Sequence, residues 1–253
     1  MHRLFTRFFF PKADVIVANS QYAAHDLKYH FSVPANKVSY IHNAIDTEYI
    51  AAKVEAKSIE PLNKNKFRFI HIGAFKVGKN HELLIDAFNE IATSEDELIL
   101  IGSGELKDAI KSKIDALGLE DKVTIVGFSD NPFAYLVMSD CFVLSSDFEG
   151  FPNVLLEALA CDLPVISTDC FAGPREILAP KTECTKHLIR ENEFAEYGIL
   201  VPVANLHCLS SAMRRIKTDS ALRKRYIENA PARIRDLTLN KVAARFEKLL
   251  TEK

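Results

Sequence analysis

The feature that most constrains the fold of this chain is the pattern of residues 141–167. An apolar run from Cys141 to Ser145 predicts a buried parallel strand. A glycine and a proline interrupt the chain after it, and a helix is expected from Val154 to Ala160 with Asn153 as its N-terminal cap. Residues 163–167 then predict the next strand, so the stretch forms a β-loop-α-β unit.

The loop of this unit lies where the carboxyl end of a strand meets the amino end of a helix. Ligands of open α/β sheets bind at such positions, and the free amides there favour an anion such as phosphate. Glu149 precedes the helix and Glu157 lies one turn into it, so each could accept hydrogen bonds from hydroxyls on either side of a phosphate. The helix dipole alone also favours a glutamate at Glu157, whereas Glu149 has no such local explanation.

The rest of the chain alternates in the same way between short apolar runs and helical periodicity. This alternation predicts an α/β fold with a doubly wound parallel sheet of the Rossmann-like type. Further strands are expected at 67–72, 98–101 and 123–126. Helices are expected at 80–92, 105–117, 131–138, 205–217, 220–229 and 239–250. Near the start, a strand is expected at 13–18, then a helix through Tyr29 with Ser20 as its N-terminal cap, and a strand at 37–41. Residues 51–66 read as a loop.

Composition excludes several classes of function. The net charge is −2, which argues against a nucleic-acid binder that depends on bulk charge. No apolar run has the length of a membrane-spanning helix. The five cysteines are scattered without Cys-x-x-Cys spacing and the eight histidines form no ligand pattern, which predicts reduced thiols in a cytosolic protein and no metal site.

The spacing of Glu149 and Glu157, followed by Ala-Leu-Ala-Cys-x-Leu-Pro-Val-Ile, resembles the donor-binding signature of family-4 glycosyltransferases. Those enzymes are retaining and have the two-domain GT-B fold. The continuation from Ser167 to Leu178 looks like members that build bacterial surface glycans or lipid-linked oligosaccharides. The resemblance implies transfer of a hexose or N-acetylhexosamine from a nucleotide-sugar, with UDP expected, to a glycan or lipid-linked acceptor, without a metal or other cofactor.

The segment from His42 to Asp46 resembles the linker that separates the two domains of this family. The resemblance implies three parts. Residues 1–45 are a remnant of the N-terminal acceptor-side domain with the linker, and residues 46–235 are the Rossmann-like domain that binds the nucleotide-sugar donor. Residues 236–253 are a C-terminal helix, which in the family commonly crosses back to the N-terminal piece.

The same resemblance assigns the site residues. Glu149 and Lys79 are expected to be catalytic, Glu149 by holding hydroxyls of the donor sugar and Lys79 by stabilising charge on the leaving diphosphate. Ala74 stands where the family has an arginine, which removes a bidentate phosphate contact, and Lys76 replaces it only as a point charge. The residues expected to bind the donor are Gly73, Lys76, Lys79, Gly127, Phe128, Glu149, Gly150, Phe151, Pro152, Asn153, Val154 and Glu157.

For several residues, an interpretation without a role in ligand binding remains open. Lys76 and Lys79 could instead be ordinary surface charges. Residues 126–128 could simply end a strand. Arg175 and Glu176 could line the cleft or pair with each other at its rim, and the rim pair is the expectation because exposed pairs are common. His71 is expected to be a core or cleft residue and not a base.

Two other functions and several partners stay open. One alternative is a nucleotide-sugar-binding module that is inactive alone and needs a partner chain; Ala74 and the short segment before the linker favour it, whereas the intact Glu149 and Glu157 favour an enzyme. A nucleotide-sugar epimerase is the third. Residues 1–10 mix aromatic and basic side chains, so they fit a helix on the inner membrane surface or, preferably, one packed on its own domain. The apolar face of residues 239–250 suggests a homodimer or a partner chain on the N-terminal side.

Overall fold

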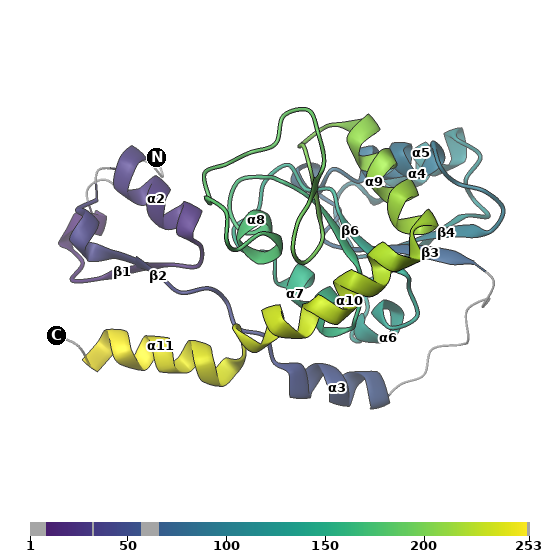
Figure 1. Ribbon diagram of the computed structural model, residues 1–253. Helices are drawn as coiled ribbons and strands as arrows, with labels where there is room; N and C mark the ends of the chain where they lie inside the picture. The colour runs from purple at the N-terminus through teal and green to yellow at the C-terminus, as the bar shows by residue number, and fades with distance from the viewer. Residues whose placement is uncertain (1–8, 32, 57–65, 252–253) are drawn as a thin grey trace.

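A seven-stranded sheet forms the centre of the computed structural model, which describes residues 9–31, 33–56 and 66–251 (Figure 1). The strand order is β5-β4-β3-β6-β7-β9-β8, and all neighbouring strands are parallel except β8, which is antiparallel to β9. The predicted doubly wound α/β fold is therefore confirmed. The strands are β3 (Phe67–Ile72), β4 (Asp96–Ile101), β5 (Val123–Gly127), β6 (Cys141–Leu144), β7 (Val165–Thr168), β8 (Glu193–Phe194) and β9 (Ile199–Val201).

Helices cover both faces of this sheet, because successive side chains of each strand point to opposite faces. In β3, Phe69 packs into a cluster with α4, α5 and α9, whereas Ile70 packs into a second cluster with α6 and α7. The helices are α3 (Thr47–Ala56), α4 (His81–Asn89), α5 (Lys107–Ala116), α6 (Phe133–Leu136), α7 (Asn153–Ala160), α8 (Pro174–Leu178), α9 (Leu206–Thr218), α10 (Ser220–Arg235) and α11 (Leu239–Thr251), with a 3₁₀ turn η3 (Val77–Lys79) before α4.

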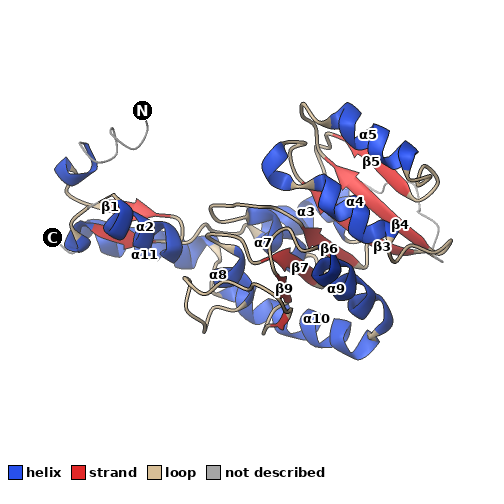
Figure 2. Ribbon diagram, turned by 90° about the horizontal axis from the view of Figure 1, so that it is seen from above, coloured by secondary structure: helices blue, strands red, loops and turns tan. Residues whose placement is uncertain are grey.

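The N-terminal part forms a small separate layer with its own core (Figure 2). It contains η1 (Phe10–Lys12), β1 (Ile16–Ala18), α2 (Gln21–His30), η2 (Ala35–Lys37) and β2 (Val38–Tyr40), and β1 and β2 pair in parallel. The Ser20 hydroxyl accepts a hydrogen bond from the amide of Ala23 at 3.1 Å, so Ser20 caps α2 as predicted. Helix α11 extends to the same end of the molecule (Figures 1 and 2).

Three expectations about local structure are wrong. Asn153 is the first residue of α7 and not its cap, and its side chain bonds to Asn43 instead of to the helix amides. Helix α3 covers residues 47–56, so the expectation of a loop is wrong for residues 51–56, and residues 57–65 of that expected loop lie outside the described residues. Helix α10 continues through Pro231 to Arg235, well beyond the expected end at Asn229.

Other expectations are not decided by this architecture. No helix of the described residues is both long and apolar enough to cross a membrane. Most of the N-terminal segment at 1–10 lies outside the described residues. The division into 1–45, 46–235 and 236–253 stays a prediction, as does a second chain on the apolar face of α11, where Phe246 and Leu250 are exposed.

Candidate functional site

The expected binding residues gather at the carboxyl ends of the parallel strands. A depression of about 420 Å³ opens there between the ends of β3, β4 and β5. It is lined by Ile72, Gly73, Ala74, Ile101, Gly102, Ser103, Phe128, Ser129 and Pro132. Gly102 has a φ of +152°, and a Cβ at this position would lie 2.0 Å from the carbonyl oxygen of Gly73, so only glycine allows the two loops to approach so closely.

Lys79 and Glu149 meet beside this depression, although they are seventy positions apart in the sequence. The Lys79 Nζ atom lies 2.5 Å from Glu149 Oε1, and the Ser146 hydroxyl donates to the same oxygen at 2.7 Å. About a quarter of the Lys79 side chain remains exposed. Because both bonds use Oε1, Glu149 Oε2 accepts no hydrogen bond from any residue in the described parts of the chain and stays able to accept one from a ligand.

The two loops that carry this pair are bonded to each other. The Ser145 hydroxyl donates to the carbonyl of Lys79 at 2.9 Å, and the Asp147 amide donates to the carbonyl of Gly78 at 2.9 Å. The side-chain amide of Asn80 donates to Asp147 at 2.8 Å. The position of Lys79 relative to the loop after β6 is therefore set by backbone and side-chain contacts, and not by the ion pair alone.

Two buried, uncharged histidines lie beneath Lys79. His71 donates from Nδ1 to the carbonyl of Val143 at 2.8 Å, and its Nε2 has no partner among the described residues. Burial, with a smaller contribution from His81, lowers the pKa of His71 to about 3. Burial, together with Lys79, lowers the pKa of His81 to about 4. Both rings are neutral near pH 7, so neither places a second positive charge beside Lys79. His71 is a buried core residue, as expected.

Helix α7 begins directly after the loop of residues 149–152. Glu157 is half-buried on its first turns, and burial raises the pKa of its carboxyl. None of the residues in the described ranges forms a side-chain hydrogen bond with Glu157, so its carboxylate is available to a ligand. The free amides of the first turn and the helix dipole add a further preference for an anion at this point.

The N-terminal part of the chain contacts this loop. The His42 ring stacks on the Phe151 ring at a centroid distance of 4.7 Å. The Asn43 side chain donates to Asn153 Oδ1 at 2.8 Å and to the carbonyl of Phe151 at 3.4 Å. A Cβ on Gly150 would lie 3.4 Å from the side chain of Asn19. The loop is thus held between the seven-stranded sheet and the N-terminal layer.

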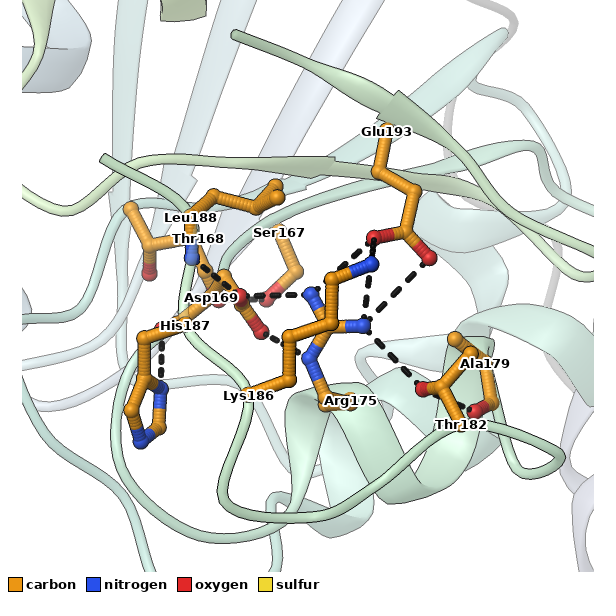
Figure 3. A network of polar contacts seen from close by, with 10 residues as sticks. All are labelled: Ser167, Thr168, Asp169, Arg175, Ala179, Thr182, Lys186, His187, Leu188 and Glu193. Atoms are coloured by element: carbon orange, nitrogen blue, oxygen red, sulfur yellow. Dashed lines mark hydrogen bonds and ion pairs between the residues drawn. The ribbon is translucent and has the colours of Figure 1, made fainter. Parts of the chain in front are cut away.

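Arg175 and Glu176 do not pair with each other, so that expectation is wrong. Figure 3 shows Arg175 between two acidic residues: it donates to Asp169 from Nε and Nη2 at 3.1 and 2.7 Å, and to Glu193 Oε2 at 3.2 Å. Glu176 instead accepts hydrogen bonds from the N-terminal layer, including His42. Both residues are buried, and each finds its partners elsewhere in the chain.

Most of the sequence-predicted residues therefore lie at one edge of the sheet. Gly73 lies against Lys79, since a Cβ on Gly73 would be 3.7 Å from Lys79 Cδ, and the Gly127 carbonyl accepts from the amide of Gly102 at the depression. Lys76 is exposed and forms no ion pair within the described parts of the chain. Sequence reasoning missed Ser146, although its position three residues before Glu149 was an available signal.

The site combines the ammonium group of Lys79, the adjacent carboxylate of Glu149 with its available Oε2 atom, and the start of α7. Lys79 and the α7 amides can bind a diphosphate, and Glu149 and Glu157 can accept hydroxyl donors on either side of it. The described residues contain no group of three or more histidine, cysteine, aspartate or glutamate side chains placed to hold a metal ion.

Comparisons with known proteins identify glycosyltransferases as relatives of this chain. The family model described as Glycosyl transferases group 1 matches residues 53–233, and the one described as Glycosyltransferase Family 4 matches residues 1–49. The chain is 36% identical over 235 residues to the N-acetylgalactosamine-N,N'-diacetylbacillosaminyl-diphospho-undecaprenol 4-alpha-N-acetylgalactosaminyltransferase of Campylobacter jejuni, covering 92% of this chain and 59% of that protein. It is 32% identical over 269 residues to an uncharacterized glycosyltransferase of Methanocaldococcus jannaschii, covering 96% of this chain and 65% of that protein. The chain thus spans about three-fifths of the length of these relatives.

Solved structures share the fold. The Anabaena protein HepE in complex with UDP superposes with a TM-score of 0.84 at 20% identity, covering 100% of this chain and 69% of that one. A glycosyltransferase from Rickettsia africae superposes with a TM-score of 0.81 at 18% identity, covering 99% of this chain and 68% of that one.

Proposed function

The chain belongs to the family of group 1 glycosyl transferases, and from this premise we propose that it binds a UDP-sugar and transfers the sugar to a hydroxyl of a glycan or lipid-linked acceptor. The sugar would be a hexose or N-acetylhexosamine, in the synthesis of a bacterial surface polysaccharide or glycoconjugate. The observation that carries the proposal is the contact between Lys79 and Glu149 at the start of α7, beside the depression at the strand ends.

Each part of the site has a role in this proposal. The base lies against the Gly127–Phe128 edge, the ribose hydroxyls donate to Glu157, and the diphosphate lies between Lys79 and the first amides of α7. Glu149 Oε2 accepts a hydroxyl of the donor sugar, while Ser146 holds Oε1. The proposal places no metal ion in the site, because Lys79 and the helix start supply the positive charge that the diphosphate requires.

In the transfer step, the bond between the anomeric carbon and the diphosphate oxygen breaks, and a bond to the acceptor oxygen forms. Negative charge then grows on the leaving diphosphate, where Lys79 stabilises it. The acceptor hydroxyl must lose a proton. His71 is a poor base because its pKa is about 3, so the proposal passes this proton to the departing phosphate oxygen. Retention at the anomeric carbon belongs to the proposal and follows from delivery of the acceptor on the side of the leaving group.

The names of several relatives support the proposed classes of sugar and acceptor. The Campylobacter relative is an N-acetylgalactosaminyltransferase acting on a diphospho-undecaprenol, and a Salmonella typhimurium relative is a lipopolysaccharide 1,6-galactosyltransferase, 28% identical over 155 residues. Structures of HepE contain UDP, UDP-glucose or UDP with glucose. A peripheral position at the inner membrane surface fits a lipid-linked acceptor. For assembly, we propose that the N-terminal layer contacts a second copy of the chain or a partner chain.

A second function is a nucleotide-sugar-binding module without activity of its own. Ala74 favours this function, because it lines the depression where an arginine would provide a bidentate phosphate contact. The module predicts saturable UDP binding without release of UDP from a UDP-sugar in the presence of acceptor lipids. An active enzyme should both bind UDP saturably and release UDP from a UDP-sugar when acceptor lipids are present.

Calorimetric titration tests the proposed donor. UDP, UDP-glucose and UDP-N-acetylglucosamine are titrated into the wild-type chain, with ADP and GDP as competitors for the base specificity. Saturable binding of the uridine nucleotides is expected, and Lys79→Ala and Glu157→Ala should each weaken it by about tenfold or more, since hydrogen bonds to charged groups contribute about 1.5–3 kcal/mol. Lys111→Ala removes an exposed lysine on α5 and serves as the matched control. A folded wild-type chain that binds no uridine nucleotide would remove the UDP assignment.

A further inference from the structure

The first turn of α2 is capped by a side chain from the other layer of the molecule. Glu176, on α8, accepts hydrogen bonds from the amides of Gln21 at 2.6 Å and Tyr22 at 3.0 Å. These are two of the amides that a helix start leaves without partners, and Ser20 binds the next one. A buried carboxylate is costly unless it is fully hydrogen-bonded, so this arrangement ties α2 to α8.

A third donor reaches the same carboxylate from the linker. His42 Nε2 lies 2.7 Å from Glu176 Oε2, and both side chains are less than a tenth exposed. Burial alone would raise the pKa of Glu176, but the hydrogen bonds from His42 and from the two α2 amides outweigh burial and lower that pKa. Glu176 is therefore a charged acceptor for three donors that lie more than 130 positions earlier in the sequence.

The backbone that presents Glu176 is itself fixed. Arg233, on α10, donates from Nη2 to the carbonyl of Glu176 at 2.8 Å and from Nε to the carbonyl of Ile177 at 3.0 Å. The guanidinium is buried together with these carbonyls. The backbone that carries the Glu176 carboxylate is thus held to α10 by two buried hydrogen bonds.

One donor of this junction, His42, also contacts the stretch of residues 149–154, which contains the loop before α7 and the first two residues of that helix and is called here the donor loop. His42 uses Nε2 for Glu176 and the face of its ring for Phe151. The next residue, Asn43, donates to the side chain of Asn153. One two-residue segment therefore connects Glu176 with the loop that leads into α7, and the carboxylate reaches that loop through His42.

We propose that Glu176 is a positioning residue for the donor loop: its carboxylate fixes α2 and His42, and His42 with Asn43 holds the loop in the shape that the donor diphosphate requires. This inference rests on the proposed function, because the shape of the loop affects ligand binding only if the donor binds there. Glu176 does not touch the donor in this arrangement, and it acts through His42.

The test compares Glu176→Gln with Glu97→Gln in the full chain. The first substitution keeps the size of the side chain but removes its charge and places an NH₂ group against N–H donors. Glu97 is also a largely buried, paired carboxylate, bonded to Arg68 at the opposite edge of the sheet. Two quantities are measured at a temperature where both variants are folded. They are amide hydrogen exchange across residues 149–155, without ligand, and UDP affinity by calorimetry.

We expect Glu176→Gln to speed exchange in the donor loop and to weaken UDP binding by about tenfold, within the usual range of coupling between two sites. Glu97→Gln should change neither. If Glu176→Gln exposes the amides of Gln21 and Tyr22 but leaves loop exchange and UDP affinity at wild-type values, Glu176 has a local structural role and the inference is overturned. If the wild-type chain binds no UDP, the proposed donor fails, and loop exchange alone still decides the role of Glu176.

Two variants of His42 keep the inference testable if Glu176→Gln does not fold. His42→Phe retains a ring against Phe151 but removes the hydrogen bond to Glu176, which keeps its two amide donors. His42→Gln retains a donor but removes the stacked ring. Both should speed exchange in the donor loop in the same direction as Glu176→Gln. Wild-type exchange in both variants would show that the junction does not hold the loop.

Discussion

Two groups of paired charges lie at the carboxyl edge of the same sheet, and they are built differently. Around Arg175, the guanidinium bonds to Asp169, Glu193 and Thr182, and Asp169 also accepts the amide of Leu188. Only 3% of the Arg175 side chain is exposed, and none of Asp169. The pair of Lys79 and Glu149 is partly exposed instead, and one carboxylate oxygen has no partner within the described ranges.

The difference separates a structural cluster from a ligand-binding site. A closed cluster has used its donors and acceptors within the protein, so it fixes the segment after β7 against α8 and has little left for a ligand. The pair of Lys79 and Glu149, called here the open pair, can exchange its internal contact for contacts with phosphate and hydroxyl groups at a small cost in free energy, since a partly exposed ion pair is weak in water.

The largest expected effect is on stability and comes from the closed cluster. Arg175→Met leaves the buried Asp169 carboxylate without its main partner, which should lower the free energy of unfolding by about 3–5 kcal/mol. Denaturant unfolding measures this change. Lys181→Met removes the exposed pair with Glu196 and is the control, with an unchanged midpoint expected. Equal, small effects of both variants would show that the cluster around Arg175 is not structural.

The next effect is on binding and comes from the open pair. Lys79→Met should weaken UDP binding by about 10- to 100-fold, because it removes a hydrogen bond to a charged phosphate worth about 1.5–3 kcal/mol. Its effect on the unfolding midpoint should be far smaller than that of Arg175→Met. Lys76→Met, which changes an exposed lysine of the same loop, should have a weaker effect on UDP affinity. A Lys79 variant with wild-type affinity and reduced stability would reverse the comparison.

The neutral histidines beneath the open pair predict a dependence of stability on pH. The pKa of His81 is about 4 in the folded chain, below the ordinary value near 6.5, so the unfolded chain binds a proton that the folded chain does not between these values. Stability should therefore fall as the pH decreases from about 6.5 to 4, by up to about 1.4 kcal/mol per pH unit for this group.

His81→Leu should make that dependence less steep, because leucine does not titrate and the ring nitrogens of His81 have no partners to lose within the described parts of the chain, while His71 keeps its own contribution. Thermal unfolding at a series of pH values gives the slope. His30→Leu changes an exposed histidine and should leave the slope unchanged. A wild-type slope in His81→Leu would show that His81 takes up its proton without unfolding.

The smallest effect is expected at Ser146, which holds Oε1 of Glu149. Ser146→Ala should weaken binding of UDP-glucose by about fivefold, the equivalent of one hydrogen bond of about 1 kcal/mol, and leave UDP affinity unchanged. Ser139→Ala, which removes a hydroxyl bonded to the carbonyl of Tyr135, is the control. Equal losses for UDP and UDP-glucose would place Glu149 near the phosphates and not near the sugar.

Sequence reasoning predicted the parts of this molecule that depend on local patterns. Apolar runs and glycines gave the strands and the loops between them, and the parallel topology brings Lys79 and Glu149 to one edge. It failed for Arg175 and Glu176, because neighbouring opposite charges suggested a local pair. Their actual partners, such as His42 for Glu176, are distant in the chain and satisfy two buried groups separately.

Asn153 shows the same limit on a smaller scale. Asparagine before an apolar helix favours a cap, but the side chain bonds to Asn43 from the linker, and the helix begins one residue earlier. Local propensity was overridden by a contact between layers. The assignment of the catalytic and donor-binding residues stays a prediction from resemblance, supported by the geometry of the open pair.

The most direct test of the central claim is a crystal structure of the chain with UDP-glucose bound. We predict a phosphate oxygen within hydrogen-bond distance of Lys79 Nζ, a sugar hydroxyl on Glu149, and an unchanged cluster around Arg175. A nucleotide bound away from the start of α7, with the contact between Lys79 and Glu149 intact, would contradict this prediction.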